Sequence, residues 1–146
     1  MASVLKGTGP ILLMLLPLWV LPGCSEDLAW QEFMKQHHLS LGLEFSQLNC
    51  EDLMGAMESL KGKTSHTFIY AIWSQIEDIC CRDGLDCYEN VRVWSVKPFK
   101  ILTCEKLESG QGYRGTSSYS YVEVHCGLNG FPVSLEDTKV EKKISD

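Results

Sequence analysis

An α+β fold, with three helices in the first half of the chain and an antiparallel sheet in the second, is predicted by two features of the sequence. Apolar residues recur at helical spacing in segments between Asp27 and Cys80, and from Asn90 onward short β-prone runs are separated by turn residues. Helices followed by strands favour an α+β arrangement over an alternating α/β one. A third feature, the six cysteines that follow a predicted N-terminal signal peptide, predicts that disulfides stabilise the fold.

The first 25 residues have the pattern of a signal peptide. Lys6 precedes the apolar run Ile11–Leu21, and the small residues Gly23 and Ser25 suit the −3 and −1 positions of a cleavage site. Cleavage one or two residues earlier remains an alternative. The run is shorter than the roughly 20 apolar residues that cross a bilayer, which disfavours a retained anchor helix. We therefore expect a secreted, extracellular protein without a membrane span.

Cleavage after Ser25 leaves one domain, residues 26–146, because 146 minus 25 gives 121 residues, too few for two cores. It also removes Cys24, so the seven cysteines become six, which is typical of three disulfides. The six are Cys50, Cys80, Cys81, Cys87, Cys104 and Cys126. A zinc site is the alternative, but the adjacent pair Cys80 and Cys81 lacks the usual gap of about two to four residues between ligands. We expect no metal and no other cofactor.

The clearest predicted helix covers Asp27–His38. Its stripe at i, i+3, i+4 and i+7 consists of Trp30, Phe33, Met34 and His37, so that a histidine ends an apolar face. Ser46 is predicted to cap a second helix, in which apolar residues keep helical spacing until Gly62 ends it. A short strand, Thr67–Tyr70, then leads into a third helix over Ala71–Cys80.

Four strands are predicted after Asn90, where β-branched and aromatic residues dominate. They cover Val91–Val96, Phe99–Cys104, Tyr119–Cys126 and Phe131–Leu135. In the third strand, period-two alternation places Val122, Val124 and Cys126 on one face, which we expect to be buried. The polar remainder, Glu136–Asp146, is predicted to be a last strand that frays into a solvated tail.

The charge of the predicted mature domain disfavours two classes of partner. The first 25 residues hold one of the 13 basic residues and none of the 19 acidic ones, so the domain carries 12 minus 19, a formal charge of −7. Affinity for nucleic acids depends mainly on cationic side chains that displace counterions from phosphates. We therefore do not expect tight RNA binding, nor attack on anionic bacterial membranes, which disfavours a role in host defence.

Three groups of residues resemble the pancreatic-type ribonuclease (ribonuclease A) superfamily. Phe33-Met-Lys-Gln-His37 is similar to the helix that carries the family's catalytic histidine, and Lys63-Thr-Ser-His-Thr-Phe68 resembles the signature Lys-x-x-Asn-Thr-Phe, with His66 replacing the asparagine. The third group consists of the cysteines, whose positions match those of the family except for one missing pair. The family's cysteine before the signature lysine is Gly62 here, and its partner near Tyr113 is also absent. The resemblance implies three N-terminal helices packed on a bent antiparallel sheet.

The disulfide pairing is also implied by the resemblance. The expected pairs are Cys50 with Cys104, Cys80 with Cys126, and Cys81 with Cys87, and an exchange of partners between Cys80 and Cys81 is the alternative. Each long-range bridge is expected to stabilise the fold by about 3 to 4 kcal/mol.

Within the superfamily, the chain is most similar to the epididymal secretory proteins of the E-three type. The segments that carry this resemblance include Phe33–His37, Val93-Trp94 and Tyr121-Val-Glu-Val-His-Cys126. It implies secretion into the epididymis and a role in sperm maturation.

The resemblance assigns roles to individual residues. His37 matches the base, Lys63 matches the cation that stabilises the phosphorane, and Gln36 and Thr67 match substrate-binding positions. The second histidine, the general acid, belongs in a Pro-Val-His-Phe-Asp context, where this chain has Pro132-Val-Ser-Leu-Glu136 and therefore Ser134. A serine hydroxyl has no useful pKa near neutrality, and loss of a positioned acid lowers a rate by about 10² to 10⁴. His125 and His66 are the candidate substitutes.

Two functions follow from this set of residues. The first is a secreted, catalytically inactive binding protein, with a monomeric ribonuclease scaffold and an unidentified partner on sperm or in the lumen. The alternative is a weak secreted ribonuclease that cleaves RNA with His37 and Lys63.

Overall fold

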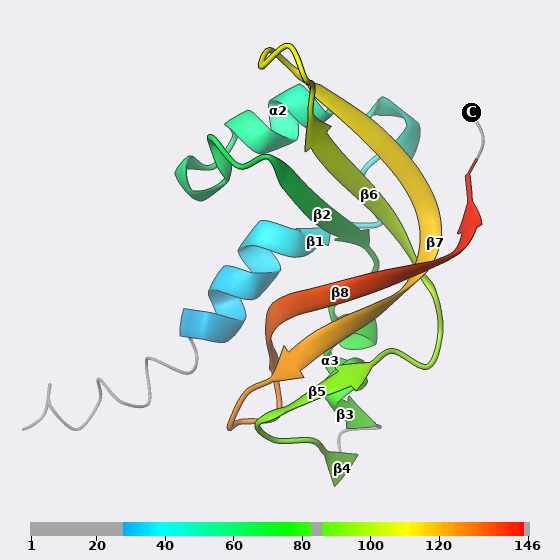
Figure 1. The fold of residues 1–146 in the computed structure, drawn as a ribbon. Helices are drawn as coiled ribbons and strands as arrows, with labels where there is room; N and C mark the ends of the chain where they lie inside the picture. The colour runs from blue at the N-terminus through cyan, green and yellow to red at the C-terminus, as the bar shows by residue number, and fades with distance from the viewer. Residues whose placement is uncertain (1–27, 83–85, 145–146) are drawn as a thin grey trace, which may run out of the picture.

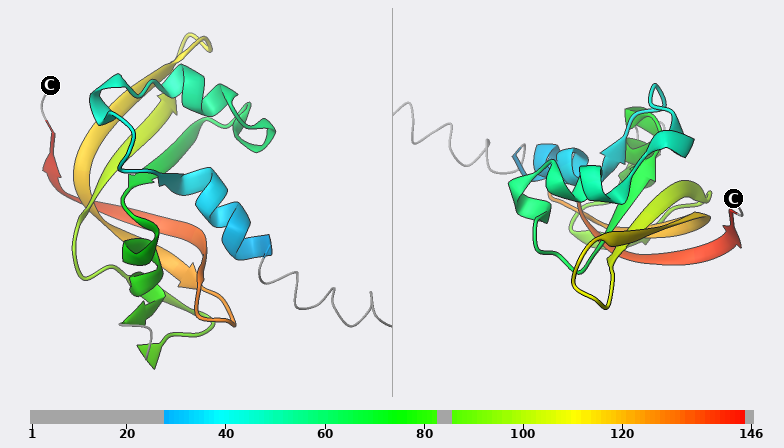
Figure 2. Two further views of the ribbon diagram at one scale, coloured as in Figure 1. Left: turned by 180° about the vertical axis from the view of Figure 1, so that it is seen from behind. Right: turned by 90° about the horizontal axis from the view of Figure 1, so that it is seen from above.

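The computed structural model describes residues 28–82 and 86–144, which form helices packed on a curled antiparallel sheet (Figure 1). Seen from above, the helical first half lies on one side and the long strands of the second half on the other (Figure 2, right). The predicted signal peptide, residues 1–25, lies outside the described residues. Within the described residues, no helix is long and apolar enough to span a membrane.

Within the described residues the first helix covers residues 28–37, and Asp27, the predicted first residue, lies outside the described part of the chain. Its predicted apolar face is confirmed, since Trp30, Phe33 and Met34 are buried. The prediction that His38 belongs to the helix is wrong. It opens β1 (His38–Leu39), which pairs in parallel with β2 (Ser65–Tyr70).

The second helix is shorter than predicted and begins later. The chain forms a 3-10 turn, η1 (Phe45–Gln47), then α2 (Cys50–Gly55) and a second 3-10 turn, η2 (Glu58–Leu60). The cap is not Ser46 but Asn49, whose side chain accepts a hydrogen bond from the Glu51 amide at 2.7 Å. Asn and Ser cap helices about equally well, and glycine weakens a helix interior, which accounts for both the wrong start and the early end at Gly55.

The third helix, α3 (Trp73–Cys80), begins two residues later than predicted. The Gln75 side chain accepts a hydrogen bond from the amide of Ile72 and so satisfies a backbone N–H at the start of the helix. Ile76, Ile79 and Cys80 are buried, as the predicted face requires. A small hairpin, β3 (Cys81–Arg82) and β4 (Asp86–Cys87), follows α3.

The main sheet is completed by four strands, and β7 is at its centre. The strands are β5 (Val91–Trp94), β6 (Phe99–Lys106), β7 (Tyr113–Cys126) and β8 (Pro132–Lys143). Their order is β1-β2-β6-β7-β5, with β8 also paired to β7. The β7–β8 register shifts at three places, one of them at Tyr119/Ser120, and such register shifts accompany the bending of a strand pair.

The prediction of a last strand after Leu135 is confirmed as far as Lys143, but this strand is not separate from the preceding one and does not fray before that residue, because β8 is continuous from Pro132 to Lys143. The polar composition reflects an exposed strand. Much of β8 beyond Leu135 is solvent-exposed, and its pairing with the 14-residue strand β7 supplies the hydrogen bonds. Charged side chains are common on such edge strands.

Two buried clusters and, among the described residues, two long-range disulfides hold the layers together, while a third disulfide closes the β3–β4 hairpin. Val122, Val124 and Cys126 are fully buried, as predicted, in the larger cluster beside α3 and the first helix. Leu60, Phe68 and neighbouring residues form the smaller one beneath α2. The disulfides are Cys50–Cys104, Cys80–Cys126 and Cys81–Cys87, the pairs that the resemblance implies.

Candidate active-site groove

A groove of about 470 Å³ lies between the first helix, the start of β2 and β8. The five residues to which the family resemblance assigns a site position line it, although they come from three separate parts of the chain: Gln36, His37, Lys63, Thr67 and Ser134. Sequence reasoning therefore selected residues that the fold brings together.

His37, the last residue of the first helix, is fixed by the strand beside it. Its Nδ1–H donates to the Thr67 carbonyl oxygen at 2.8 Å, and its ring lies 4.9 Å from that of Phe33. Because a carbonyl only accepts, the proton of the neutral ring is on Nδ1 and the lone pair is on Nε2. The pKa of His37 is lowered to about 4, mainly by burial and to a smaller extent by the nearby His66 and Lys63, against the opposing effect of the Thr67 carbonyl.

His66 is the residue whose importance the sequence reasoning underrated. It is only 5% exposed, and its ring stacks on that of His37 with the centroids 4.5 Å apart. Its Nε2–H donates to the Gln36 carbonyl oxygen at 2.7 Å. Burial lowers the pKa of His66, as does Lys63, while the Gln36 carbonyl raises it. The departure from the family's Asn at this position was the signal that pointed to it.

The two histidines connect the first helix to β2 in both directions. His37 on the helix donates to the strand, and His66 on the strand donates to the helix. Two such bonds across 30 residues of sequence fix the relative position of the two elements. Both rings therefore lie on one wall of the groove.

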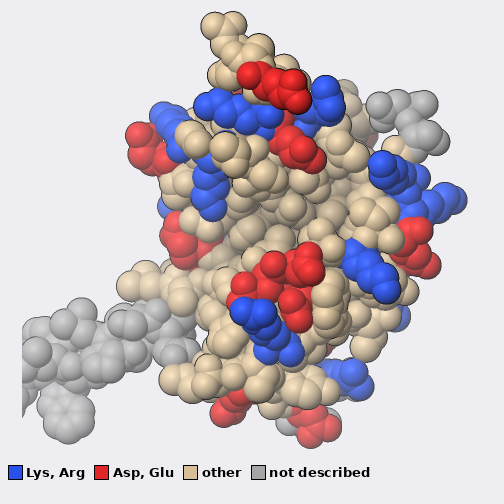
Figure 3. Space-filling view, viewed as in Figure 1, with Lys and Arg blue, Asp and Glu red and all other residues tan. Residues whose placement is uncertain are grey.

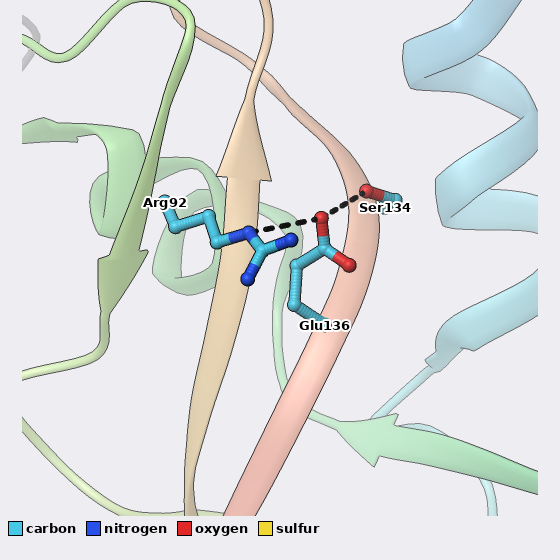
Figure 4. Close-up of polar contacts among 3 residues, drawn as sticks. All are labelled: Arg92, Ser134 and Glu136. Carbon is cyan, nitrogen blue, oxygen red and sulfur yellow. Dashed lines mark hydrogen bonds and ion pairs between the residues drawn. The ribbon is translucent and has the colours of Figure 1, made fainter.

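The opposite wall is β8, where Ser134 occupies the position that the family resemblance assigns to the acid. The Ser134 hydroxyl donates to Glu136 Oε1 at 3.4 Å, and Arg92 Nε lies 3.7 Å from the same oxygen (Figure 4). His125, one of the two candidate substitutes for the acid, does not line the groove.

The charges around the groove are mixed. Lys63 is its one cationic lining residue among the described residues, whereas Glu136 and Asp137 are both acidic. Figure 3 shows acidic side chains gathered over β8 in the middle of this face. No group of three or more potential metal ligands occurs in the described parts of the chain.

Comparison with known proteins identifies the family of the chain. The family model described as pancreatic ribonuclease matches residues 28–136. The chain belongs to the pancreatic ribonuclease family. The human relative "Epididymal secretory protein E3-beta" is 42% identical over the full length of both chains, and human "Epididymal secretory protein E3-alpha" is 38% identical over the same extent.

Solved ribonucleases share the fold. Amphinase, a cytotoxic ribonuclease from Rana pipiens oocytes, superposes with a TM-score of 0.63 at 21% identity, over 77% of this chain and 98% of its own. The ribonuclease SS-RNase-2 (des116-120) gives a TM-score of 0.59 at 27% identity, over 79% and 97%. The predicted α+β fold of the ribonuclease A type is thereby confirmed.

Other contacts occur in the structure at the place where the family's additional disulfide is missing from this chain. By the resemblance, a disulfide should join the position of Gly62 to the turn near Tyr113. In its place the Tyr113 hydroxyl donates to the Lys63 carbonyl oxygen at 3.1 Å, and the Tyr113 amide donates to Glu51 Oε1 at 3.2 Å. The first of these hydrogen bonds connects the two segments that the missing disulfide would have joined, and the second connects the turn to α2.

Proposed function

We propose that this member of the pancreatic ribonuclease family is a secreted epididymal protein that acts in sperm maturation by binding, without efficient cleavage of RNA. The observation that carries the proposal is Ser134, hydrogen-bonded to Glu136 on the wall opposite His37. The place of secretion rests on the relatives, which are named as epididymal secretory proteins.

The arrangement of the imidazoles supports inactivity. Phosphoryl transfer requires the attacking and leaving oxygens to lie roughly in line, so the base and the acid must act from opposite sides of the phosphorus. His37 and His66 are stacked on one wall. A general base works best with a pKa near the operating pH, and a pKa of about 4 makes His37 a weak base at neutrality.

Restoring the missing acid tests the proposal. Ser134→His places an imidazole where Glu136 already accepts a hydrogen bond from residue 134. We expect cleavage of a pyrimidine-rich RNA to rise by about 10² to 10⁴. Ser134→Asn, similar in size but without a titratable group, is the control. Wild-type cleavage as fast as that of the histidine variant would contradict the proposal.

Binding requires a separate experiment. Labelled mature protein is incubated with epididymal sperm and with luminal fluid, and saturable binding that unlabelled protein displaces is the expected result. Displacement by an unrelated acidic protein of similar size would indicate non-specific adsorption. Absence of saturable binding to either preparation would remove the binding half of the proposal.

A weak ribonuclease is the second candidate, favoured by the presence of His37, Lys63 and Thr67 together in one groove. In that case His66 would supply the missing proton. His66→Asn, which introduces the residue of the family signature, separates the two functions. Under the first proposal it leaves RNA cleavage unchanged at background, whereas a fall of tenfold or more from a measurable wild-type rate establishes the enzyme.

A further inference from the structure

A second groove, of about 630 Å³, is lined by residues of α3 and of the loop that joins β5 to β6. Figure 2 (left) shows this loop beside α3. It shares no lining residue with the groove that contains His37. Volumes of roughly 300 to 1,000 Å³ are typical of sites for small organic molecules. The second groove is therefore large enough for a ligand of its own.

Large apolar side chains with high exposure gather in this groove. Four of them line it: Leu41 (47% exposed), Trp94 (40%), Val96 (69%) and Tyr119 (41%). Single exposed apolar residues are normal on soluble proteins, but a contiguous group marks a binding surface. These four side chains, called the apolar floor below, thus suit an apolar ligand.

The charge of this groove is opposite to that of the whole chain. The chain has a formal charge of −6, yet three cations, Arg82, Lys97 and Lys100, line the groove against one acid, Asp78. Neither ion pair found within the described ranges involves any of these four side chains. Asp78 and Arg82 offset each other on the α3 side, so the excess positive charge lies on the β5–β6 side.

Lys100 is held in position by aromatic rings. Its Nζ lies 4.2 Å from the ring centroid of Phe45, which does not line this groove, and 5.7 Å from that of Tyr70, which does. Such contacts orient an ammonium group without neutralising it, because the ring carries no net charge. The groove therefore combines an apolar floor with a positioned cation.

We propose that this groove binds a single-chain anionic amphiphile, such as a free fatty acid carboxylate. The hydrocarbon chain lies against Trp94, Val96 and Tyr119, and the head group is bound by Lys97 and Lys100. An acidic peptide would satisfy the cations, but the groove's volume and its apolar floor favour a small ligand. The site is independent of the function proposed above, and it stands whether or not RNA is cleaved.

Calorimetric titration of the mature, disulfide-bonded protein with dodecanoate, below the concentration at which dodecanoate forms micelles, tests the proposal. We expect saturable binding at one site, binding of dodecan-1-ol weaker by about fivefold, and no binding of acetate, since the apolar floor and the cations both contribute. Equal binding of the alcohol and the carboxylate would overturn the proposed role of the cations. Binding of a glutamate-rich peptide in place of dodecanoate would overturn the choice of ligand.

Matched variants locate the site. Lys97→Glu is expected to weaken dodecanoate binding by at least fivefold, whereas Lys106→Glu, the same charge change at the far end of β6, leaves binding unchanged. Val96→Glu is expected to weaken it as well, and Leu128→Glu, an exposed apolar position that does not line the groove, is its control. All four positions are exposed, so folding is retained. Equal effects of the groove variants and the controls would refute the site.

Discussion

Individual residues decide the chemistry of the active-site groove, and His66 is the clearest case. From the sequence, His66 is a departure from a motif next to Lys63. In the structure its ring stacks on His37, and each ring donates one N–H to a backbone carbonyl of the opposite element. The sequence could predict His37, Lys63, Thr67 and Ser134 because their motifs are local. It could not predict the stacking, which depends on packing between segments 30 residues apart.

The histidine pair makes stability depend on pH. Both pKa values are lowered in the folded state, so between pH 6.5 and about 4 the unfolded chain binds more protons than the folded one. The free energy of unfolding therefore falls as pH falls through this window, by about 3 kcal/mol for His37 alone.

Urea unfolding at pH 7, 5.5 and 4.5 measures this dependence. His66→Asn is expected to reduce the loss between pH 7 and 5.5, since the variant removes one of the two lowered pKa values and the repulsion on His37. His125→Asn, which removes a histidine outside the groove, is the matched control for the loss of an imidazole. If the unfolding free energies of wild type and His66→Asn fall by the same amount as the pH is lowered, the pair does not titrate in this way.

At the scale of elements, the sequence predicted helix and strand order well and their ends poorly. The two-residue strand β1 has too little sequence to form a pattern, yet its pairing of His38 with Ile69 aligns the end of the first helix with β2. The full length of β8 was not predicted for a different reason: a polar edge strand has the same amino-acid composition as a solvated tail. Long-range pairing, rather than local propensity, fixed both features.

Gly110 and Gly130 have the same backbone conformation but different surroundings. Alanine variants of the two therefore distinguish the stability cost of backbone strain from that of steric crowding. Gly110 has φ +82° with open space around a Cβ, whereas Gly130 has φ +77° and a Cβ there would lie 2.9 Å from the Cβ of Cys87. Gly110→Ala is expected to cost about 1 kcal/mol through the left-handed conformation alone. Gly130→Ala should cost at least about 1 kcal/mol more, because neighbouring atoms in the β3–β4 hairpin must also move.

Thermal or urea unfolding of the two alanine variants, side by side, gives the difference directly. Equal destabilisation would mean that the Cys81–Cys87 hairpin yields easily to the added methyl group.

At the scale of the whole molecule, the disulfides compensate for a modest core. Cys80–Cys126 spans 46 residues and joins α3 to β7, whereas Cys81–Cys87 spans six residues within one hairpin. The chain-entropy relation gives about 4 kcal/mol for the first and about 2 kcal/mol for the second. We expect the double alanine variant of the long bridge to lose roughly twice as much unfolding free energy as that of the short one. Equal losses would show that chain entropy is not the main contribution.

The family fold is shared with active ribonucleases, so the fold alone does not decide between enzyme and binding protein. That decision depends on what lies opposite His37 across the groove, where this chain has Ser134 and Glu136.

The most direct measurement is the rate at which the purified mature protein cleaves a cytidine-containing dinucleotide, compared with that of its His37→Ala variant. We expect the two rates to be equal and to match the background without protein. A wild-type rate clearly above background that His37→Ala abolishes would establish a working base and acid in the groove, and the binding-protein account would be wrong.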